Sequence, residues 1–262
     1  MRGFRRELFM TDYSNYKVLI LGAGLGTRLR PLTNTVPKVM VPIYKDKPLL
    51  LHEILFLKRQ GFTNFIINVH YLPEKITEYF GDGSRFGVSI EYSDESKGLM
   101  ETAGAIKKAA NSLSKNFIFI YGDELYFFDF RKLVEAHEKN RALATVVLKR
   151  SDNPQAGEIA KIDPETKRIL EWHVRPHDIH EFHEHTYVNS GLYALSKRIL
   201  DFIPAHTPLR LDIHVLNKLV AQGERIFGYP ANENILDIGT PEKYEFAKQW
   251  YLTKLKESPF YE

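Results

Sequence analysis

The segment Lys17-Val-Leu-Ile-Leu-Gly-Ala-Gly-Leu-Gly-Thr-Arg-Leu-Arg-Pro-Leu-Thr-Asn-Thr-Val-Pro-Lys38 determines the fold and the kind of site that we expect for this chain. Its apolar run, residues 18–21, has the length of a buried strand and leads directly into three glycines within five residues. Glycines after a strand tolerate positive φ and let backbone N–H groups approach a ligand closely. Arg28, Arg30 and Lys38 follow and supply the cationic groups that a polyphosphate needs. A turn with solvated charges would explain any one of these residues, but their combination predicts a phosphate-binding loop.

Two other glycine-rich loops that bind phosphate do not fit this segment. A dinucleotide-binding loop reads G-x-G-x-x-G and runs directly into a helix, whereas Thr27 stands in place of the third glycine. Pro31 and Pro37 would also interrupt a long helix. The Walker pattern fails because no Gly-Lys-Ser/Thr follows the glycines at the required spacing.

The composition is that of an ordinary globular protein. Its 262 residues, 44% hydrophobic and 26% charged, suffice for one large domain or two small ones. The net charge of +3 is small and the basic residues are scattered, which argues against nucleic acid as a partner. The chain has no cysteine, which excludes disulfides, thiolate metal sites and cysteine nucleophiles. No apolar run approaches the ~20 residues of a membrane span, so we expect a cytoplasmic protein without a membrane partner.

Apolar runs of strand length alternate with helical patterns over the first 150 residues. The expected strands are 18–21, 65–69, 88–92, 117–121 and 144–148, and the expected helices are 50–57, 73–80, 103–110 and one that includes 133–137. This alternation predicts an α/β fold with a doubly wound, mostly parallel sheet. Such sheets bind ligands at the carboxyl ends of their strands, which is where the glycine-rich segment begins.

Shorter strands are expected from about residue 151 onward. They cover 158–162, 186–193 and 225–229, with a helix over 211–221 and a closing helix over 241–256. The predicted organisation is an N-terminal tail (1–15), one domain (16–248) and a C-terminal helix and tail (249–262). The later part of the domain, 151–248, would complete the sheet and wall the pocket.

Two carboxylates follow apolar runs at widely separated positions. Asp123 comes after the strand 117–121 and Gly122, where a carboxylate can hold Mg²⁺ beside a phosphate; taken alone, a helix-capping role would be preferred. Asp237 precedes Thr240-Pro241, which has the pattern of a helix N-terminus. A carboxylate in an apolar run needs a partner if it is buried, so a shared cation is a plausible explanation of both residues.

The segment 17–38 resembles the signature G-x-G-T-R-L-x-P-L-T, followed by P-K, of the sugar-1-phosphate nucleotidyltransferases, or NDP-sugar pyrophosphorylases. The motifs are most similar to those of mannose-1-phosphate guanylyltransferases and N-acetylmuramate-1-phosphate uridylyltransferases. The resemblance covers residues 16–248 and implies a Rossmann-like, glycosyltransferase-A-like fold. It also implies a Mg²⁺-dependent in-line reaction of an NTP with a sugar 1-phosphate, giving an NDP-sugar for cell-envelope polysaccharide and pyrophosphate. Residues 16–150 would then form the nucleotide-binding half and 151–248 the sugar-binding half; a homo-oligomer is possible.

The resemblance assigns roles to individual residues. Arg28 would hold the β- and γ-phosphates, Lys38 would neutralise charge on the α-phosphate or the leaving group, and Asp123 would complete the catalytic set. Asp123 and Asp237 would be the metal ligands. Residues 100–106 resemble the base-contacting L-G-T-A-G-A segment, with Glu101 in place of its glycine, and purine and pyrimidine bases both stay open. The expected nucleotide contacts are Leu21, Gly22, Ala23, Gly24, Leu25, Gly26, Thr27, Arg28, Lys38, Glu101, Thr102 and Gly104.

The sugar phosphate is expected to meet four residues of the later half. Gly157 occupies the place where a backbone group meets the sugar, and Asn189 and Gly191 lie on a strand that resembles the sugar-lining one. A glycine within a strand indicates a close approach, by a ligand or equally by a neighbouring side chain. Arg175 would replace the lysine that meets the sugar phosphate. Val174 stands where relatives have a glutamate that accepts sugar hydroxyls, so the identity of the sugar stays open.

Two further interpretations compete with these. Five histidines within thirteen residues, His173, His177, His180, His183 and His185, have spacings that zinc could use, but mixed polarity around Pro176 favours an exposed loop. The second is that the chain is a catalytically silent, NDP-sugar-binding regulatory protein on the same fold. The intact glycine-rich segment, Lys38, Asp123 and Asp237 favour the enzyme.

Overall fold

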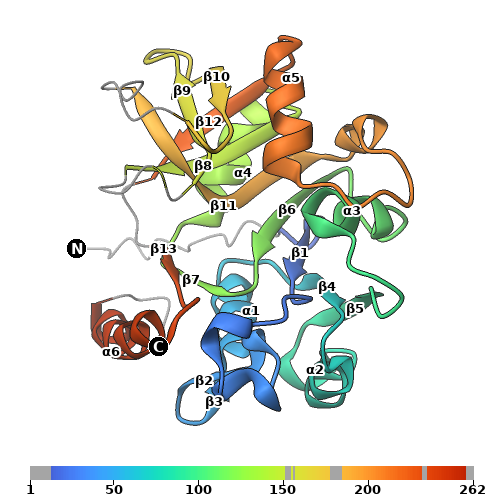
Figure 1. Ribbon diagram of the computed structural model, residues 1–262, viewed down its shortest axis with the longest axis vertical. Coiled ribbons are helices and arrows are strands. Elements are labelled where there is room, and N and C mark those ends of the chain that lie inside the picture. The colour runs from blue at the N-terminus through green and yellow to red at the C-terminus, as the bar shows by residue number, and fades with distance from the viewer. Residues whose placement is uncertain (1–12, 151–154, 156, 178–184, 232–234, 258–262) are drawn as a thin grey trace, which may run out of the picture.

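The computed structural model describes residues 13–150, 155, 157–177, 185–231 and 235–257. Its centre is a sheet of nine strands in the order β10-β9-β11-β6-β1-β4-β5, in which β8 pairs with β11 and β12 pairs with β8 (Figure 1). The strands are β1 (Lys17–Leu21), β4 (Asn64–Val69), β5 (Ser89–Asp94), β6 (Asn116–Tyr121), β8 (Ala144–Lys149), β9 (Ile159–Ile162), β10 (Ile169–His173), β11 (Thr186–Ser196) and β12 (Ile226–Pro230). The four neighbours β6, β1, β4 and β5 run parallel, which confirms the expected α/β fold with a largely parallel central sheet.

Residues 18–21 of strand β1 are all apolar because both faces of the strand are covered. Val18 and Ile20 pack into a hydrophobic cluster with residues of α1 (Leu49–Arg59), α2 (Pro73–Phe80) and α4 (Phe130–Lys139). Leu19 points to the opposite face and packs into a second cluster with residues of α3 (Glu101–Lys108) and α5 (Asn217–Ala221). Successive side chains of a strand alternate between faces, so a strand between two helical layers reads as a continuous apolar run.

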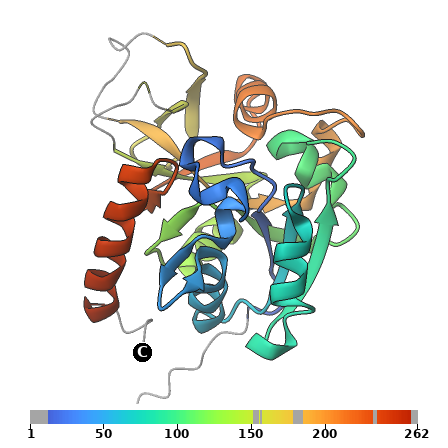
Figure 2. The same ribbon diagram turned by 60° about the horizontal axis from the view of Figure 1, so that its bottom comes forward.

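The later half of the chain lies at one end of this sheet. Strands β9, β10 and β12 gather there with α5, whereas α1 and α2 lie toward the other end (Figure 1). Helix α6 (Pro241–Glu257) runs along the flank opposite α2 (Figure 2). Before α6, the short strand β13 (Ile235–Asp237) pairs antiparallel with β7 (Glu124–Tyr126), which directly follows β6. This pairing brings residues 235–237 to the carboxyl edge of the parallel strands.

The elements that the sequence did not predict are all short. They are β7, β10 and the hairpin of β2 (Pro42–Tyr44) with β3 (Lys47–Pro48), each two to five residues long. Segments of this length show no readable period. The expected helix 211–221 opens with a π-helical turn over Leu211–Leu216, and the helix expected at 103–110 spans 101–108 instead.

Two of the expected domain boundaries fall in packed parts of the structure. Tyr13 belongs to the segment expected as a tail, yet it is 7% exposed and its ring stacks on Phe62 with centroids 5.0 Å apart. The boundary expected at residue 248 lies inside α6, whose next turn buries Tyr251. In the part of the chain that the structure describes, no helix has the length and hydropathy needed to cross a bilayer.

Replacing Tyr13 by alanine is expected to lower the free energy of unfolding by about 3 kcal/mol, because it removes a buried aromatic ring from the core. Chemical denaturation measures this difference. Phe246→Ala is the matched control, since Phe246 is 56% exposed on α6 and its loss should cost less than about 0.5 kcal/mol. Equal stability of Tyr13→Ala and the wild type would contradict the packing of residue 13 into the domain.

Candidate active site

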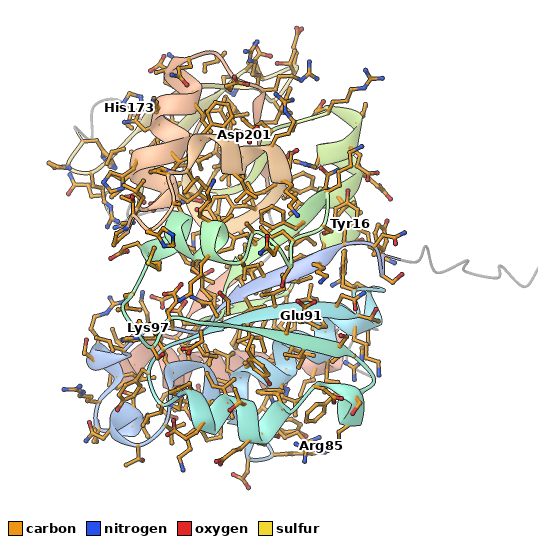
Figure 3. All side chains as sticks on the ribbon, turned by 90° about the vertical axis from the view of Figure 1, so that its right-hand side faces the viewer. Tyr16, Arg85, Glu91, Lys97, His173 and Asp201 are labelled. Atoms are coloured by element: carbon orange, nitrogen blue, oxygen red, sulfur yellow. The ribbon has the colours of Figure 1, made fainter. Side chains whose placement is uncertain are left out.

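The glycine-rich segment and Asp123 leave the sheet side by side. Strands β1 and β6 are parallel neighbours with Leu21 opposite Tyr121, and the Gly122 N–H donates to the Leu21 carbonyl at 3.0 Å. A Cβ at position 122 would lie 2.6 Å from that carbonyl oxygen, so only glycine permits this approach. Figure 3 shows Tyr16, which precedes β1, on the opposite side of the molecule from two residues near strand ends. These are Lys97, which lies beyond the carboxyl end of β5, and His173, the last residue of β10. Both segments therefore leave the sheet at the carboxyl edge of its parallel strands, the edge at which the sequence predicts a ligand-binding site.

The glycine-rich loop is fixed at both ends and open in its middle. The Gly22 N–H donates to the Asn68 carbonyl (3.1 Å) and side-chain Oδ1 (2.6 Å). Gly26 has a φ of 63° and accepts a hydrogen bond from the Thr33 hydroxyl at 2.7 Å. Among the described residues, no neighbouring atom lies within 4 Å of the position that a Cβ on Gly24 would take. Between its anchors, therefore, the loop leaves space beside Gly24 for a ligand to approach the backbone.

Lys38 joins the two carboxylates that the sequence singles out. Its Nζ donates to Asp123 Oδ2 at 2.6 Å and lies 3.6 Å from Asp237 Oδ1. The side chain of Lys38 is only 7% exposed, which strengthens both ion pairs relative to pairs in water. Asp237 reaches this point because β13 pairs with β7 and sets it opposite Glu124. The structure thus brings together three predicted residues from positions 38, 123 and 237.

A fourth charged residue, Lys243 at the start of α6, donates to Asp237 Oδ2 at 2.7 Å. No motif in the sequence points to this lysine. Although burial alone would raise the pKa of Asp237, the hydrogen bond from Lys243 and the charge of Lys38 hold that pKa below its usual value. Burial and the adjacent Asp123 raise the pKa of Glu124 to about 8. The pKa values of Asp237 and Glu124 are thus shifted in opposite directions, and Glu124 Oε2 bonds to no described residue.

A cavity of about 90 Å³ lies directly beside these charges. It is lined by Leu21, Gly24, Lys38, Val39, Tyr121 and Asp123. Arg28 is exposed and extends toward the turn after Asp237, where its Nη2 would lie 2.9 Å from a Cβ on Gly239. The cavity is therefore faced by an open backbone, a buried ammonium group and a carboxylate, with a guanidinium nearby.

The chemistry of these residues fits a Mg²⁺ ion that is bound by the carboxylates and by oxygens of a phosphate group. Asp123 and Asp237 both reach toward the single position held by Lys38 Nζ, and Mg²⁺ commonly takes one or two carboxylates together with phosphate oxygens and water. Among the described residues, no three His, Asp or Glu side chains converge into a complete metal-binding group. The protein can thus supply part of a coordination sphere that a bound phosphate completes.

Residues 101–104 pack mainly against the later half of the chain. The Thr102 hydroxyl accepts a hydrogen bond from the Leu211 N–H at 2.7 Å, and a Cβ on Gly104 would lie 2.9 Å from the Thr207 carbonyl oxygen. Glu101 is exposed and has a φ of 59°. Packing accounts for Thr102 and Gly104, and Glu101 is the one of the three whose side chain is open to a ligand.

The expected sugar residues lie on and beside β11. The Asn189 side chain donates to the Tyr193 hydroxyl at 2.7 Å and accepts from the Gly191 N–H at 3.1 Å. Gly191 has a φ of 73°, and a Cβ there would lie 2.8 Å from the Tyr121 ring. The close approach at Gly191 is thus made by a side chain of the protein itself. Gly157 is likewise required by packing, because its Cβ would lie 2.6 Å from Val188.

Arg175 belongs to a charged network that the sequence analysis missed. Its guanidinium donates to Glu158 Oε1 through Nε at 3.1 Å and Nη2 at 3.0 Å, and Arg210 Nη2 lies 3.7 Å from the same oxygen. Arg210 also donates to both oxygens of Asp212, at 3.1 and 2.6 Å. Glu158 and Asp212 are buried in runs of mainly apolar residues, and a charged residue there was the signal that could have revealed them.

Of the five clustered histidines, His180 and His183 lie outside the described residues. His177 Nε2 donates to the Gly157 carbonyl at 2.9 Å, and His173 Nε2 lies 3.1 Å from Glu171. No metal-binding group forms around the histidines that the structure describes.

Comparison with known families matches residues 17–254 to the family described as Nucleotidyl transferase. A UTP–glucose-1-phosphate uridylyltransferase from Synechocystis is 31% identical over 91% of this chain and 64% of its own length. A mannose-1-phosphate guanylyltransferase from Mycobacterium tuberculosis is 32% identical over 86% of this chain and 62% of its own length. The chain thus spans slightly less than two thirds of these relatives. A D-glycero-alpha-D-manno-heptose 1-phosphate guanylyltransferase from Aneurinibacillus thermoaerophilus is 31% identical over 89% of this chain and 97% of its own length.

A solved structure shares the fold. HddC from Yersinia pseudotuberculosis superposes with a TM-score of 0.73 and 26% identity, covering 90% of this chain and 99% of HddC. HddC has also been solved in complex with GMP-PN, again with a TM-score of 0.73.

The glycine geometry gives a prediction for stability. Gly122→Ala should lower the free energy of unfolding by about 1–3 kcal/mol, because its Cβ would press on the Leu21 carbonyl and on Ile20. Gly24→Ala is the matched control, and its open surroundings predict a change of less than about 1 kcal/mol. Urea denaturation of both variants checks this. Equal losses would contradict the described loop geometry.

Proposed function

We propose that this chain, which belongs to the nucleotidyl transferase family, transfers a nucleotidyl group from an NTP to a sugar 1-phosphate and releases an NDP-sugar and pyrophosphate. The observation that carries the proposal is Lys38 held between Asp123 and Asp237 beside the open glycine-rich loop. The relatives named above, which carry the names of uridylyl- and guanylyltransferases acting on sugar 1-phosphates, support it. We propose a guanylyl- or a uridylyltransferase.

The reaction we propose is a single in-line displacement. A phosphate oxygen of the sugar 1-phosphate attacks the α-phosphorus of the NTP, the new P–O bond forms, and the bond to pyrophosphate breaks. No covalent intermediate on the protein is needed, so positioning and charge neutralisation are the main contributions. Mg²⁺ held by Asp123 and Asp237 would neutralise charge on the reacting phosphates.

The nucleotide would lie along the glycine-rich loop. Backbone N–H groups of residues 21–27 would face the triphosphate and the base, and Arg28 would hold the β- and γ-phosphates. Lys38 would turn from the carboxylates toward the α-phosphate or the leaving pyrophosphate as negative charge arrives there. The base would meet the segment that contains Glu101, with Thr102 and Gly104 supporting it. Residues 16–150 form the nucleotide-binding half in this proposal.

The sugar phosphate would bind within the half 151–248, beside β11 and Arg175. Arg175 would orient the attacking phosphate, and its two hydrogen bonds to Glu158 hold the guanidinium plane in place. Gly157, Asn189 and Gly191 would shape the wall that faces the sugar ring. The charged network at this position favours a substrate with several hydroxyl groups.

We propose the cytoplasm as the compartment of the reaction.

A regulatory protein that binds an NDP-sugar without turnover is the alternative. It would need the nucleotide and sugar pockets, but neither Lys38 beside the α-phosphate nor a pair of metal-binding carboxylates. The ion pairs among these three residues favour the enzyme.

The test is pyrophosphate release with Mg²⁺, using five NTPs against a panel of sugar 1-phosphates. We expect one or a few pairs to react, with GTP or UTP as the nucleotide. Lys38→Ala and Asp123→Asn should each reduce turnover by about 10²–10³-fold, because each removes a charge that faces the reacting phosphates.

Lys248→Ala is the control for these variants, since Lys248 is a surface residue on α6 that pairs with Glu245. Its turnover should equal that of the wild type. Thermal melts confirm that each variant is folded. Near-normal turnover of a folded Lys38→Ala or Asp123→Asn would refute the assigned roles, and nucleotide-sugar binding without any pyrophosphate release would favour the regulatory protein.

A further inference from the structure

A buried chain of hydrogen bonds connects the glycine-rich loop to the segment 95–101. The Gly22 N–H donates to Asn68 Oδ1 at 2.6 Å, and Asn68 Nδ2 donates to Glu95 Oε1 at 3.1 Å. The other oxygen of Glu95, Oε2, accepts the Met100 N–H at 3.1 Å. Four residues from three separate segments are therefore joined in one line, which starts at the first glycine of the loop and ends one residue before Glu101.

Both side chains in the middle of this line are removed from water. Asn68 and Glu95 are each 1% exposed. No cation of the described residues is within bonding distance of the Glu95 carboxylate, whose bonds come from an amide side chain and a backbone N–H. A buried carboxylate without a counter-ion is costly, and a neutral side chain would be cheaper if filling space were the only requirement.

The direction of the hydrogen bonds explains why these two residue types are present. Gly22 and Met100 both present N–H donors. The Gly22 N–H also donates to the Asn68 carbonyl at 3.1 Å, so the Asn68 side chain supplies it with a second and closer acceptor. Asn68 supplies an acceptor to Gly22 and a donor to Glu95, and Glu95 accepts at both of its oxygens. A glutamine at position 95 would turn an N–H₂ group toward one of two donors and break the line.

Further bonds make the segment 95–98 a rigid extension of the sheet. The Glu95 N–H donates to the Val69 carbonyl at 2.7 Å, the Gly98 N–H donates to the Glu95 carbonyl at 2.9 Å, and His70 Nδ1 lies 2.8 Å from the same carbonyl. On the other side, the Met100 carbonyl accepts the Leu209 N–H at 3.2 Å. Glu95 is thus bonded directly to Met100 and, through Asn68, to Gly22.

We propose that Asn68 and Glu95 are positioning residues that hold the glycine-rich loop and the segment 95–101 in one frame, and that this frame sets the affinity for the nucleotide. The proposal rests on the proposed function, in which the loop meets the triphosphate and the segment meets the base. Neither side chain touches the nucleotide. Both act through the backbone N–H groups that they orient.

Reversing the chain by two substitutions tests this proposal. Asn68→Asp places a carboxylate against Glu95, and Glu95→Gln places an N–H₂ group against a donor, so each single variant breaks the line. In the double variant, the new carboxylate at position 68 would accept from the Gly22 N–H and from the new amide at position 95. The carbonyl oxygen of that amide would accept from the Met100 N–H, so every donor regains an acceptor. Calorimetry with GTP and with UTP, each with Mg²⁺, should give about tenfold weaker binding in each single variant and wild-type binding in the double variant.

Hydrogen–deuterium exchange tests the same frame without any ligand. Glu95→Gln should raise exchange in residues 21–28 as well as in 95–101, although position 95 belongs to only one of these segments. Exchange that rises only around residue 95 would overturn the proposal, whatever the activity of the protein is. Failure of the proposed function has a different signature, namely a wild type that releases no pyrophosphate with any substrate pair.

Gln60→Glu is the control for a buried amide-to-acid change. Gln60 is 1% exposed, and its side chain donates to the Phe128 carbonyl at 3.0 Å and accepts from the Phe130 N–H at 2.8 Å. This variant should lose stability while binding nucleotide like the wild type, and KM for the sugar 1-phosphate should be unchanged in all variants. If a single variant does not fold, the double variant decides: tenfold weaker nucleotide binding there would overturn the proposal, and wild-type binding would support it.

Discussion

The ion pairs of Lys38 with Asp123 and Asp237 are the interaction on which the arrangement of the site depends. They hold together three segments that the chain supplies far apart: the turn after the glycine-rich loop, the end of β6 and the end of β13. Each segment is brought there by backbone pairing, since β1 and β6 are parallel neighbours and β13 pairs with β7. Removing the Lys38 charge would leave Asp123 and Asp237 close together in a partly buried position, where like charges repel strongly. The same closeness would let a divalent cation and a phosphate group replace the ammonium.

The parallel core could be predicted from sequence because it depends on local signals, and so could the grouping of Lys38, Asp123 and Asp237. The run 18–21 is apolar at every position, as expected for a strand that is covered on both faces. Ordinary packing does not explain all of the closely spaced glycines that follow it. Asp123 and Asp237 could be paired on paper because both end apolar runs. Glu158, Asn68 and Glu95 could not be paired in this way, since their hydrogen-bond partners Arg175, Gly22 and Asn68 are distant from them in the chain. Their partners become visible only when β9, β5 and the turn before α5 are placed in space.

The glycines divide into two groups that the sequence alone cannot separate. Gly122, Gly157 and Gly191 are required by packing, because a Cβ at each would meet a backbone carbonyl, Val188 or the Tyr121 ring. A Cβ on Gly24 would meet no described neighbour, and Gly24 lines the cavity beside Lys38. The sequence predicts that a ligand comes close at Gly24, Gly157 and Gly191. In the structure a side chain of the protein itself is the close neighbour at Gly157 and Gly191, whereas the space beside Gly24 is open to a ligand.

Binding of a divalent cation tests the central charge cluster most directly. Mn²⁺ can be titrated by electron paramagnetic resonance into the wild type, Asp123→Asn, Asp237→Asn and Lys248→Ala, each with a non-hydrolysable NTP analogue present. We expect the wild type and Lys248→Ala to bind Mn²⁺ with the same affinity, and both aspartate variants to lose this binding while they remain folded. Undiminished Mn²⁺ binding in both aspartate variants would contradict the assignment of this cluster as the place where metal and phosphate meet.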